Sequence, residues 1–509
     1  MKRGRTPLFR LALRHLARST PELLDRRRFL AGTAAAGLAA ATGGCVSRGR
    51  SMAGPKGPVA VVGAGLAGMT CAYRLSRKGV PVHLYEASAR AGGRVHTREG
   101  FNDDGMFVEL GAELIDTGHK SVLRLARELG LRAQSLVAGE EGGETFWFDG
   151  RAYGEKDVLP AFRPLGLRIA ADAKGLYDRR GGFTEKARRL DAVSLGAYLR
   201  DRGGDTAPWV LRLLVAAYEP EFGLPVEEQS CLNLVDFINP DTSRHFEIFG
   251  DSDEAWRIEG GNGRLPAALR EALGASVDLR LGHRLESVRK RPEGIALAFR
   301  TREGRIESAY ERVVVATPFS VLRGVDGLGG LGLSPEKLRC IREMGYGANV
   351  KVFRGFRRRV WRDPIDGRGF RANGSVYAET PSFQNVWETS RGQAGERGIL
   401  TNFLGARRAR EYAPTRMARF LGDLEKVFPG VGVAYDGSSA AMDWQRMPFA
   451  RGSYSCPRPG QYTWMYETAA SPELDGALLF AGEHTSLESA GFMDGAVETG
   501  FRAAREALA

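Results

Sequence analysis

Three glycines near the start of the chain are spaced to hold a dinucleotide. In the pattern Gly63-x-Gly65-x-x-Gly68 the first glycine permits a tight turn, the second lets the backbone approach a pyrophosphate, and the third lets the following helix pack closely. Glu86 stands 23 positions after Gly63, where a carboxylate can accept a hydrogen bond from a ribose 2′-hydroxyl. These residues predict a bound NAD or FAD.

The elements around these glycines come in the order that such a site requires. An apolar run at Val59–Val62 predicts a buried parallel strand, and Val82–Tyr85 predicts the next one. Residues 67–78 between them predict a helix whose N-terminus faces the phosphates. Strand, glycines, helix, strand and acid together are much more specific than the glycines alone.

A second glycine pair distinguishes FAD from NAD. Gly92 and Gly93 leave room for another pass of backbone beside the dinucleotide, and the flanking Arg90 and Arg94 can contact the pyrophosphate. This continuation favours FAD, the alternative being a surface loop without a ligand.

The whole block resembles the flavin-containing amine oxidase family, which includes monoamine, polyamine and L-amino acid oxidases. The resemblance implies an α/β fold, with a Rossmann-like FAD-binding domain that is discontinuous in sequence and an inserted α+β substrate-binding domain. The expected ranges are 1–57 for an export signal and tether, 58–118, 251–333 and 436–509 for the FAD-binding domain, and 119–250 and 334–435 for the substrate-binding domain.

The C-terminal part carries the most specific resemblance. A strand at 478–481 leads into Gly482 and Glu483, an acid expected at the ribityl or phosphate edge of the flavin. A helix from about Met493 would present small residues to the cofactor and direct its N-terminus at flavin N1 and O2. Leu285 resembles the family residue whose backbone lies beside the adenine, within a pair of strands.

Three further residues take catalytic roles from the resemblance. Tyr454 and Phe492 match the two aromatic residues that flank the substrate nitrogen, although both could be ordinary core aromatics. Lys351 matches the lysine that reaches flavin N5 through a water, although a lysine in an alternating strand is usually solvated. The implied reaction moves a hydride from the carbon beside the nitrogen to flavin N5, and O2 then reoxidises the flavin to give H2O2.

The residues around this cage bear on the cofactor linkage and the substrate. Ser453 stands where monoamine oxidases have the cysteine that bonds to flavin, so we expect non-covalent FAD. Asp116 could pair with a distal ammonium group of the substrate, or be an exposed turn aspartate. Leu114 replaces the arginine that amino-acid oxidases often use for the substrate carboxylate.

Several functions stay open at this stage. Besides a monoamine, the substrate could be a polyamine or an L-amino acid. The chain could also be a flavin desaturase or dehydrogenase acting on a nonpolar substrate, or a noncatalytic exported flavoprotein. The expected partners are a small-molecule amine and O2, with a homodimer left open.

Charge and composition exclude other classes. Residues 1–50 contain eleven basic and two acidic residues, so they hold +9 of the net charge of +12 and leave only +3 for the rest. This distribution removes the main argument for nucleic-acid binding. The five cysteines and seven histidines show no metal-ligand spacing, so we expect no metal.

The basic N-terminus predicts export. Arg26 and Arg27 belong to a stretch that resembles a twin-arginine signal, and the apolar run at 29–42 is too short to span a bilayer about 30 Å thick. Cys45 resembles a lipoprotein cleavage site. We therefore expect a periplasmic or membrane-anchored extracytoplasmic protein, with membrane attachment through the N-terminus as one alternative.

Overall fold

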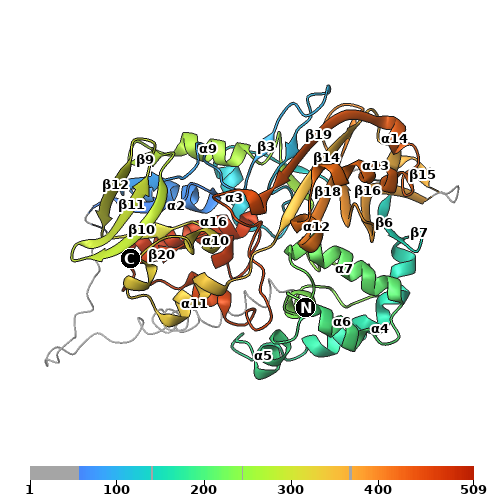
Figure 1. Ribbon diagram of the computed structural model, residues 1–509, viewed down its shortest axis with the longest axis horizontal. Coiled ribbons are helices and arrows are strands. Elements are labelled where there is room, and N and C mark those ends of the chain that lie inside the picture. Colours follow the sequence, from blue (N-terminus) through green and yellow to red (C-terminus); the bar gives the residue numbers. More distant parts are fainter. Residues whose placement is uncertain (1–54, 56, 139–140, 244, 366–369) are drawn as a thin grey trace, which may run out of the picture.

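The computed structural model describes residues 55, 57–138, 141–243, 245–365 and 370–509. The expected export signal, including Cys45, lies outside these residues. A nucleotide-binding part and a larger mixed sheet lie side by side, and a group of helices lies beneath the larger sheet (Figure 1). None of the helices in the described ranges combines the length and apolar character that a membrane span needs.

A five-stranded parallel sheet forms the centre of the nucleotide-binding domain. Its strands, in spatial order, are β20 (Leu478–Phe480), β13 (Val313–Val315), β1 (Val59–Val62), β2 (Val82–Tyr85) and β9 (Val277–Arg280). The two predicted strands are confirmed as β1 and β2. Both faces are buried, because Val59 and Val61 pack into one hydrophobic cluster whereas Ala60 and Val62 pack into another.

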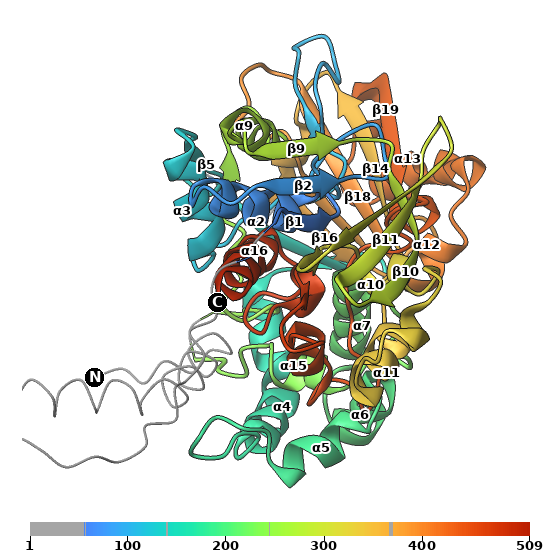
Figure 2. The ribbon, with the colours of Figure 1, turned by 90° about the vertical axis from the view of Figure 1, so that its left-hand side faces the viewer.

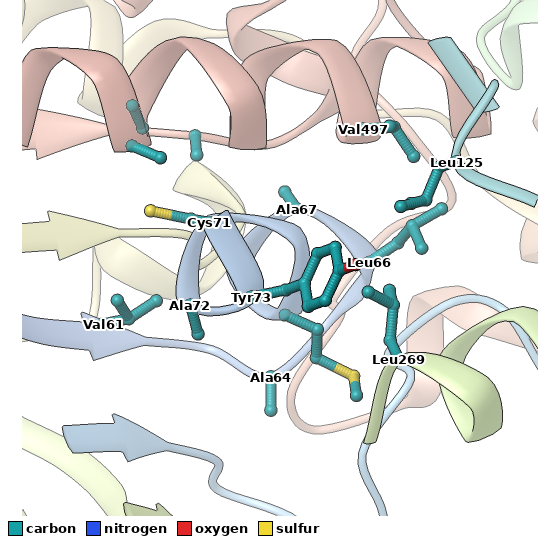
Figure 3. Packing of buried hydrophobic residues seen from close by; sticks show 14 of the residues in the cluster. Val61, Ala64, Leu66, Ala67, Cys71, Ala72, Tyr73, Leu125, Leu269 and Val497 are labelled. Carbon is teal, nitrogen blue, oxygen red and sulfur yellow. The ribbon is translucent and has the colours of Figure 1, made fainter. Parts of the chain in front are cut away.

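Two helices cover one face of this sheet. The helix α2 (Leu66–Ser76) follows β1 directly, and α16 (Met493–Leu508) packs against it (Figure 2). Figure 3 shows Leu66 and Tyr73 of α2 close to Leu125 and Leu269, which come from α3 (Lys120–Glu128) and α9 (Arg264–Ala272). The other face is covered by an antiparallel sheet of β10 (Arg284–Arg291), β11 (Gly294–Arg300) and β12 (Arg305–Tyr310), one strand more than the predicted pair.

The second domain consists of a mixed sheet and a helical layer. The strand order is β19 (Tyr435–Asp443), β14 (Asn349–Phe356), β18 (Gly398–Gly405), β17 (Asn385–Glu388), β16 (Phe370–Ala378), β6 (Gly143–Phe148) and β7 (Arg151–Tyr153), with β15 (Pro364–Ile365) paired to β16. The helices are α4 (Glu155–Ala173), α5 (Glu185–Asp191), α6 (Leu195–Gly203), α7 (Pro208–Phe222) and α8 (Leu232–Val235). The predicted α/β fold with an inserted α+β domain is confirmed.

The remaining elements are short connections between these layers. They are β3 (Thr97–Arg98), β4 (Val108–Glu109), β5 (Ala133–Ser135), β8 (Trp256–Ile258), α10 (Phe319–Leu322), α11 (Pro335–Glu343), α12 (Ala406–Arg410), α13 (Ala418–Glu425), α14 (Val431–Ala434) and α15 (Met465–Ala470).

The packing at three places differs from the predicted domain ranges. The helix α3 packs into the core of the nucleotide-binding domain through Val122 and Leu125, although it lies after residue 118. Likewise α11 contributes Cys340 and Ile341 to the core on the other face of the parallel sheet. The strand β19 pairs with β14 in the larger sheet, so the predicted border at 435/436 falls inside a strand. Apolar helix faces pack on either domain equally well, so helical periodicity alone does not assign α3 and α11 to a domain.

Candidate active site

One cavity of about 1370 Å³ runs between the two domains. This volume exceeds the roughly 300–1,000 Å³ of a pocket for one small molecule, so the cavity has room for a dinucleotide and a substrate. All predicted site residues line it except Gly68. They are Gly63, Gly65, Glu86, Arg90, Gly92, Gly93, Arg94, Asp116, Leu285, Lys351, Tyr454, Gly482, Glu483, Phe492 and Met493.

The glycine turn at the end of β1 is sterically demanding. Gly63 has φ +106°, in the region that favours glycine, and a Cβ there would lie 3.0 Å from the Ala316 carbonyl oxygen. A Cβ at Gly68 would lie 1.9 Å from the Gly63 carbonyl oxygen. Gly68 therefore lets α2 pack closely on the turn, as predicted, and needs no contact with the cavity.

The second glycine pair lies directly against the first turn. Gly65 and Gly92 form a parallel bridge, and a Cβ at Gly93 would lie 3.0 Å from the Gly65 Cα. No side chain caps α2 at Gly65, and its first turn has no acidic residue. A narrow backbone cradle with free helical N–H groups suits the pyrophosphate of a dinucleotide.

Glu86 ends β2 at the cavity wall. Its Oε2 accepts from the Ala64 N–H at 2.9 Å, and its Oε1 accepts from the backbone and the hydroxyl of Ser88, both at 2.8 Å. A carboxylate has about four acceptor positions, so it can still accept from a ribose hydroxyl. The side chain thus fixes the glycine turn and faces the cavity.

The two flanking arginines bind the protein itself. Arg90 donates to the carbonyls of Ala91, Gly93 and Val95, so it fixes the loop that contains the second glycine pair. Arg94 donates from Nη1 to the Ser453 carbonyl at 2.5 Å and to Glu483 Oε1 at 2.9 Å.

Glu483 joins three segments that are distant in sequence. Besides Arg94, its carboxylate accepts from the Ser455 hydroxyl at 2.8 Å and from the Gly491 N–H at 3.0 Å. Burial alone would raise the pKa of Glu483, but the charges of Arg94 and His484, with the hydrogen bonds from Arg94 and Ser455, together outweigh burial and hold this pKa below its usual range. The carboxylate is ionised and organises the wall of the cavity.

The helix α16 begins at Met493, where its N-terminus was predicted. No side chain caps it, and Met493 lies at the cavity. The small residues of this helix divide between two surroundings, because Ala496 lines the cavity whereas Gly500 packs against α2. A Cβ at Gly500 would lie 2.5 Å from the Ala67 carbonyl oxygen, so this residue permits close packing on α2.

The predicted cage residues Tyr454 and Phe492 both line the cavity. The Tyr454 hydroxyl donates to the carbonyls of Glu221, at 2.6 Å, and Pro220, at 3.0 Å, which fixes the ring. The Phe492 ring centre lies 4.8 Å from that of His119. Ser453 donates to Asn349 Oδ1 at 2.6 Å, and Cys456 is fully buried, with burial raising the pKa of its thiol.

Lys351 is not a solvated strand residue. It is 6% exposed, on β14, and its Nζ lies 2.7 Å from Glu113 Oε2, 2.9 Å from the Gly111 carbonyl oxygen and 3.3 Å from that of Glu109. Glu113 was missed in the sequence, because neither a motif nor its spacing distinguishes it.

Asp116 is buried too, which excludes the exposed turn. Its Oδ1 accepts from the Ser252 hydroxyl at 3.0 Å and from the Glu254 N–H at 2.9 Å. Glu221 and Glu254 also line the cavity, and the charges of the three acids act on one another. Among the described residues, neither of these two carboxylates has a hydrogen-bond or ion-pair partner.

The three acids influence one another. Burial, followed by the Asp116 charge, raises the pKa of Glu221 to about 7. Burial, followed by the charges of Glu221 and Asp116, raises the pKa of Glu254 to about 8. In the part of the chain that the structure describes, no group of His, Cys, Asp and Glu residues could hold a metal ion.

Comparison with known sequences gives a consistent result. The family model "Flavin containing amine oxidoreductase" matches residues 66–508. The flavin-dependent L-tryptophan oxidase RebO of Lentzea aerocolonigenes is 29% identical over 498 residues, covering 88% of this chain and 97% of that protein. An L-amino-acid oxidase of Gloydius halys is 24% identical over 476 residues, covering 88% of each chain.

Two solved structures with similar folds are of a putrescine oxidase and a cyclohexylamine oxidase. Putrescine oxidase bound to putrescine superposes with a TM-score of 0.70 at 22% identity, covering 88% of this chain and 98% of that one. Cyclohexylamine oxidase from Brevibacterium oxydans superposes with a TM-score of 0.71 at 20% identity, covering 89% and 99%. At these identities the likeness establishes the fold.

Proposed function

The chain belongs to the flavin containing amine oxidoreductase family, and we propose that it deaminates a primary or secondary amine bearing a second positive charge, with O2 as electron acceptor. The cofactor of this oxidoreductase is FAD. The observation that carries the proposal is that one cavity is lined by the glycine turn and also by Tyr454, Phe492 and the three acids.

The chain's own residues fit FAD. The N-termini of α2 and α16 have no side-chain cap and both lie at the cavity, where their N–H groups would hold the pyrophosphate and the flavin edge that becomes negative on reduction. When bound, FAD supplies the two-electron chemistry: it takes a hydride from the carbon beside the amine nitrogen and passes both electrons to O2.

Tyr454 and Phe492 favour the uncharged form of the amine nitrogen. Their rings exclude water from the reacting end, which favours the uncharged amine from which hydride transfer proceeds. The hydrogen bonds of the Tyr454 hydroxyl to the end of α7 hold its ring in place, so the apolar face is fixed before the substrate arrives.

The acids favour a substrate with a second cation. Asp116, Glu221 and Glu254 repel one another in a buried environment, and an ammonium group among them would relieve this repulsion and satisfy the two unpartnered carboxylates. The carboxylate of an L-amino acid would meet the same repulsion, and Leu114 offers it no charge. These charges support a diamine or polyamine over an amino acid.

Anaerobic mixing of the holoenzyme with putrescine, spermidine, benzylamine and leucine tests this proposal. We expect loss of oxidised-flavin absorbance with the diamine and the polyamine, followed by H2O2 production when O2 is added. Reduction by leucine alone would favour an L-amino acid oxidase. A flavin that no amine reduces would refute amine oxidation and favour the desaturase or noncatalytic alternatives.

We further propose that FAD is held without a covalent bond. Ser453 supports this, because a serine hydroxyl does not form the thioether that a cysteine at this position makes. Acid precipitation should release the flavin into the supernatant, and flavin retained on the precipitated protein would refute the proposal.

Export is the remaining proposal and depends on residues 1–54. The twin-arginine-like stretch and Cys45 support an extracytoplasmic protein, attached to the membrane if Cys45 is lipidated. Replacing Arg26 and Arg27 with lysine should leave the protein in the cytoplasmic fraction. Cys45→Ser should move it from the membrane to the soluble extracytoplasmic fraction if the cysteine is the anchor.

A further inference from the structure

The Lys351 ammonium has every donor engaged inside the protein. Its three N–H groups match three acceptors, namely the Glu113 carboxylate and the carbonyl oxygens of Gly111 and Glu109. Two of the acceptors are backbone atoms and carry no formal charge. The Glu113 carboxylate, at 2.7 Å, is therefore the contact that supplies the opposite charge.

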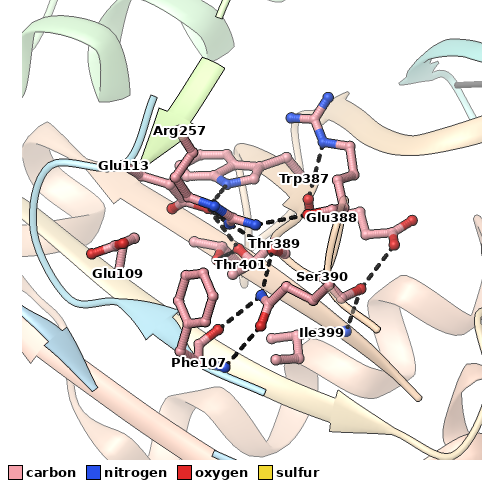
Figure 4. Close-up of polar contacts among 12 residues, drawn as sticks. Phe107, Glu109, Glu113, Arg257, Trp387, Glu388, Thr389, Ser390, Ile399 and Thr401 are labelled. Carbon is pink, nitrogen blue, oxygen red and sulfur yellow. Dashed lines mark hydrogen bonds and ion pairs between the residues drawn. The ribbon is translucent and has the colours of Figure 1, made fainter. Parts of the chain in front are cut away.

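Glu113 is itself fixed from two further sides. Its Oε1 accepts from Trp387 Nε1 at 3.1 Å and from the Thr389 hydroxyl at 3.0 Å, both contributed by the β17 segment (Figure 4). Arg257, which is 1% exposed, places Nη1 4.0 Å from the same oxygen. The carboxylate has a defined position before any ligand binds.

The two cations of this cluster, Lys351 and Arg257, keep Glu113 ionised. Burial would raise the pKa of Glu113, but the charges of Lys351 and Arg257, together with the hydrogen bonds from Lys351 and Trp387, outweigh burial and lower this pKa. Burial raises the pKa of the neighbouring Glu109 to about 7, and its oxygens accept from the Asn262 N–H and the Thr97 hydroxyl instead of the lysine. Lys351, Arg257, Glu109 and Glu113 are the charged and titratable groups of this cluster.

We propose that Glu113 is a positioning residue that holds the Lys351 side chain in its charged form and in a fixed place at the cavity wall. The proposal rests on the proposed function and on the role that the family resemblance gives Lys351, which lines the cavity, at the reacting edge of the flavin. Conversion of O2 to H2O2 takes two electrons and two protons, which the reduced cofactor and solvent supply. A fixed ammonium stabilises the negative charge that develops on oxygen as the electrons arrive.

Reoxidation of photoreduced holoenzyme tests this without any amine. Stopped-flow mixing with O2 across pH compares wild type with Glu113→Gln, Lys351→Met and the double variant. The opposite charge favours the buried ammonium, so Glu113→Gln should lower the reoxidation rate toward that of Lys351→Met and change how the rate depends on pH. The double variant should match Lys351→Met.

Glu388→Gln is the matched control. Glu388 is a buried glutamate of β17 that pairs with Arg359 and Arg362 and does not contact Lys351. The Glu388→Gln variant should have lower thermal stability than wild type and an unchanged pH profile of reoxidation. Glu113→Asp, which keeps the charge, should restore most of the wild-type profile.

Unfolding of the flavin-free protein gives a second readout. Glu113→Gln and Lys351→Met should each lower the melting temperature, and the double variant should lower it by less than their sum, because each single change leaves a buried charge without its partner. Additive effects, or a Glu113→Gln pH profile that coincides with wild type, would overturn the proposal. If no amine reduces the flavin, these measurements still decide the role of Glu113.

Discussion

The sharpest prediction concerns Glu254, whose carboxylate has no partner within the described protein but lies at the proposed second-cation end of the cavity. Glu254→Gln keeps the shape and removes the charge. A hydrogen bond to a charged group is worth about 1.5–3 kcal/mol, so kcat/KM for a diamine should fall about 10- to 150-fold. For benzylamine, which has no second cation, it should change by less than about twofold.

The pH dependence follows from the same charges. Because the pKa of Glu254 is raised to about 8, the carboxyl is mostly protonated at pH 6 and mostly ionised at pH 9. The decrease in kcat/KM for a diamine caused by Glu254→Gln should therefore be small at pH 6 and reach its full size near pH 9. Glu221, Asp116, Glu144 and Arg391 also act on this carboxyl, with Arg391 lowering its pKa.

Steady-state H2O2 production with putrescine and benzylamine at both pH values measures the effect. Glu259→Gln is the control, since Glu259 lies outside the cavity and pairs with Arg132 on the surface. An equal loss for both substrates would mean that Glu254 does not recognise a second cation. A loss of the same size at pH 6 and pH 9 would contradict the charge argument.

Three further predictions concern stability and cofactor binding. Gly68→Ala places a methyl group 1.9 Å from the Gly63 carbonyl oxygen and should lower the free energy of unfolding by about 1–3 kcal/mol. Denaturant unfolding measures this decrease, and the purified variant should contain less FAD. Glu483→Gln removes the ion pair with Arg94 and should cost about 1.5–3 kcal/mol, measured in the same way; unchanged stability would show that the pair is dispensable. Glu254 binds its proton more tightly in the folded than in the unfolded chain, so its contribution to stability is complete below pH 4.5 and is lost as pH rises through about 8. The melting temperature of flavin-free Glu254→Gln should accordingly fall less between pH 5 and pH 9 than that of wild type.

The nucleotide-binding half was predictable because its information is local. Gly63, Gly65 and Gly68 lie within six residues, and the turn that they form depends on steric limits at those positions. The strand and helix around them follow from apolar runs of the right length. Each of these features can be recognised without knowing where the rest of the chain lies.

The substrate end was less predictable because it is assembled from separate segments. Asp116, Glu221 and Glu254 are each more than 30 residues apart, and no spacing rule connects them. Lys351 lies in a strand of alternating polar and apolar residues, and its contact with Glu113 is visible only in the folded structure. The small residues of α16 were assigned to the cofactor, although close packing on α2 requires them equally.

The parallel sheet also constrains how the enzyme is made. Val313 of β13 pairs with Leu478 of β20, about 165 positions later, and Glu483 and α16 follow β20. The segment from β20 to α16 must therefore be synthesised before the FAD site can be complete. Such distant pairing slows folding. We expect cofactor loading to be a late, post-translational event, and flavin supplied only during synthesis of a nascent chain should not be retained.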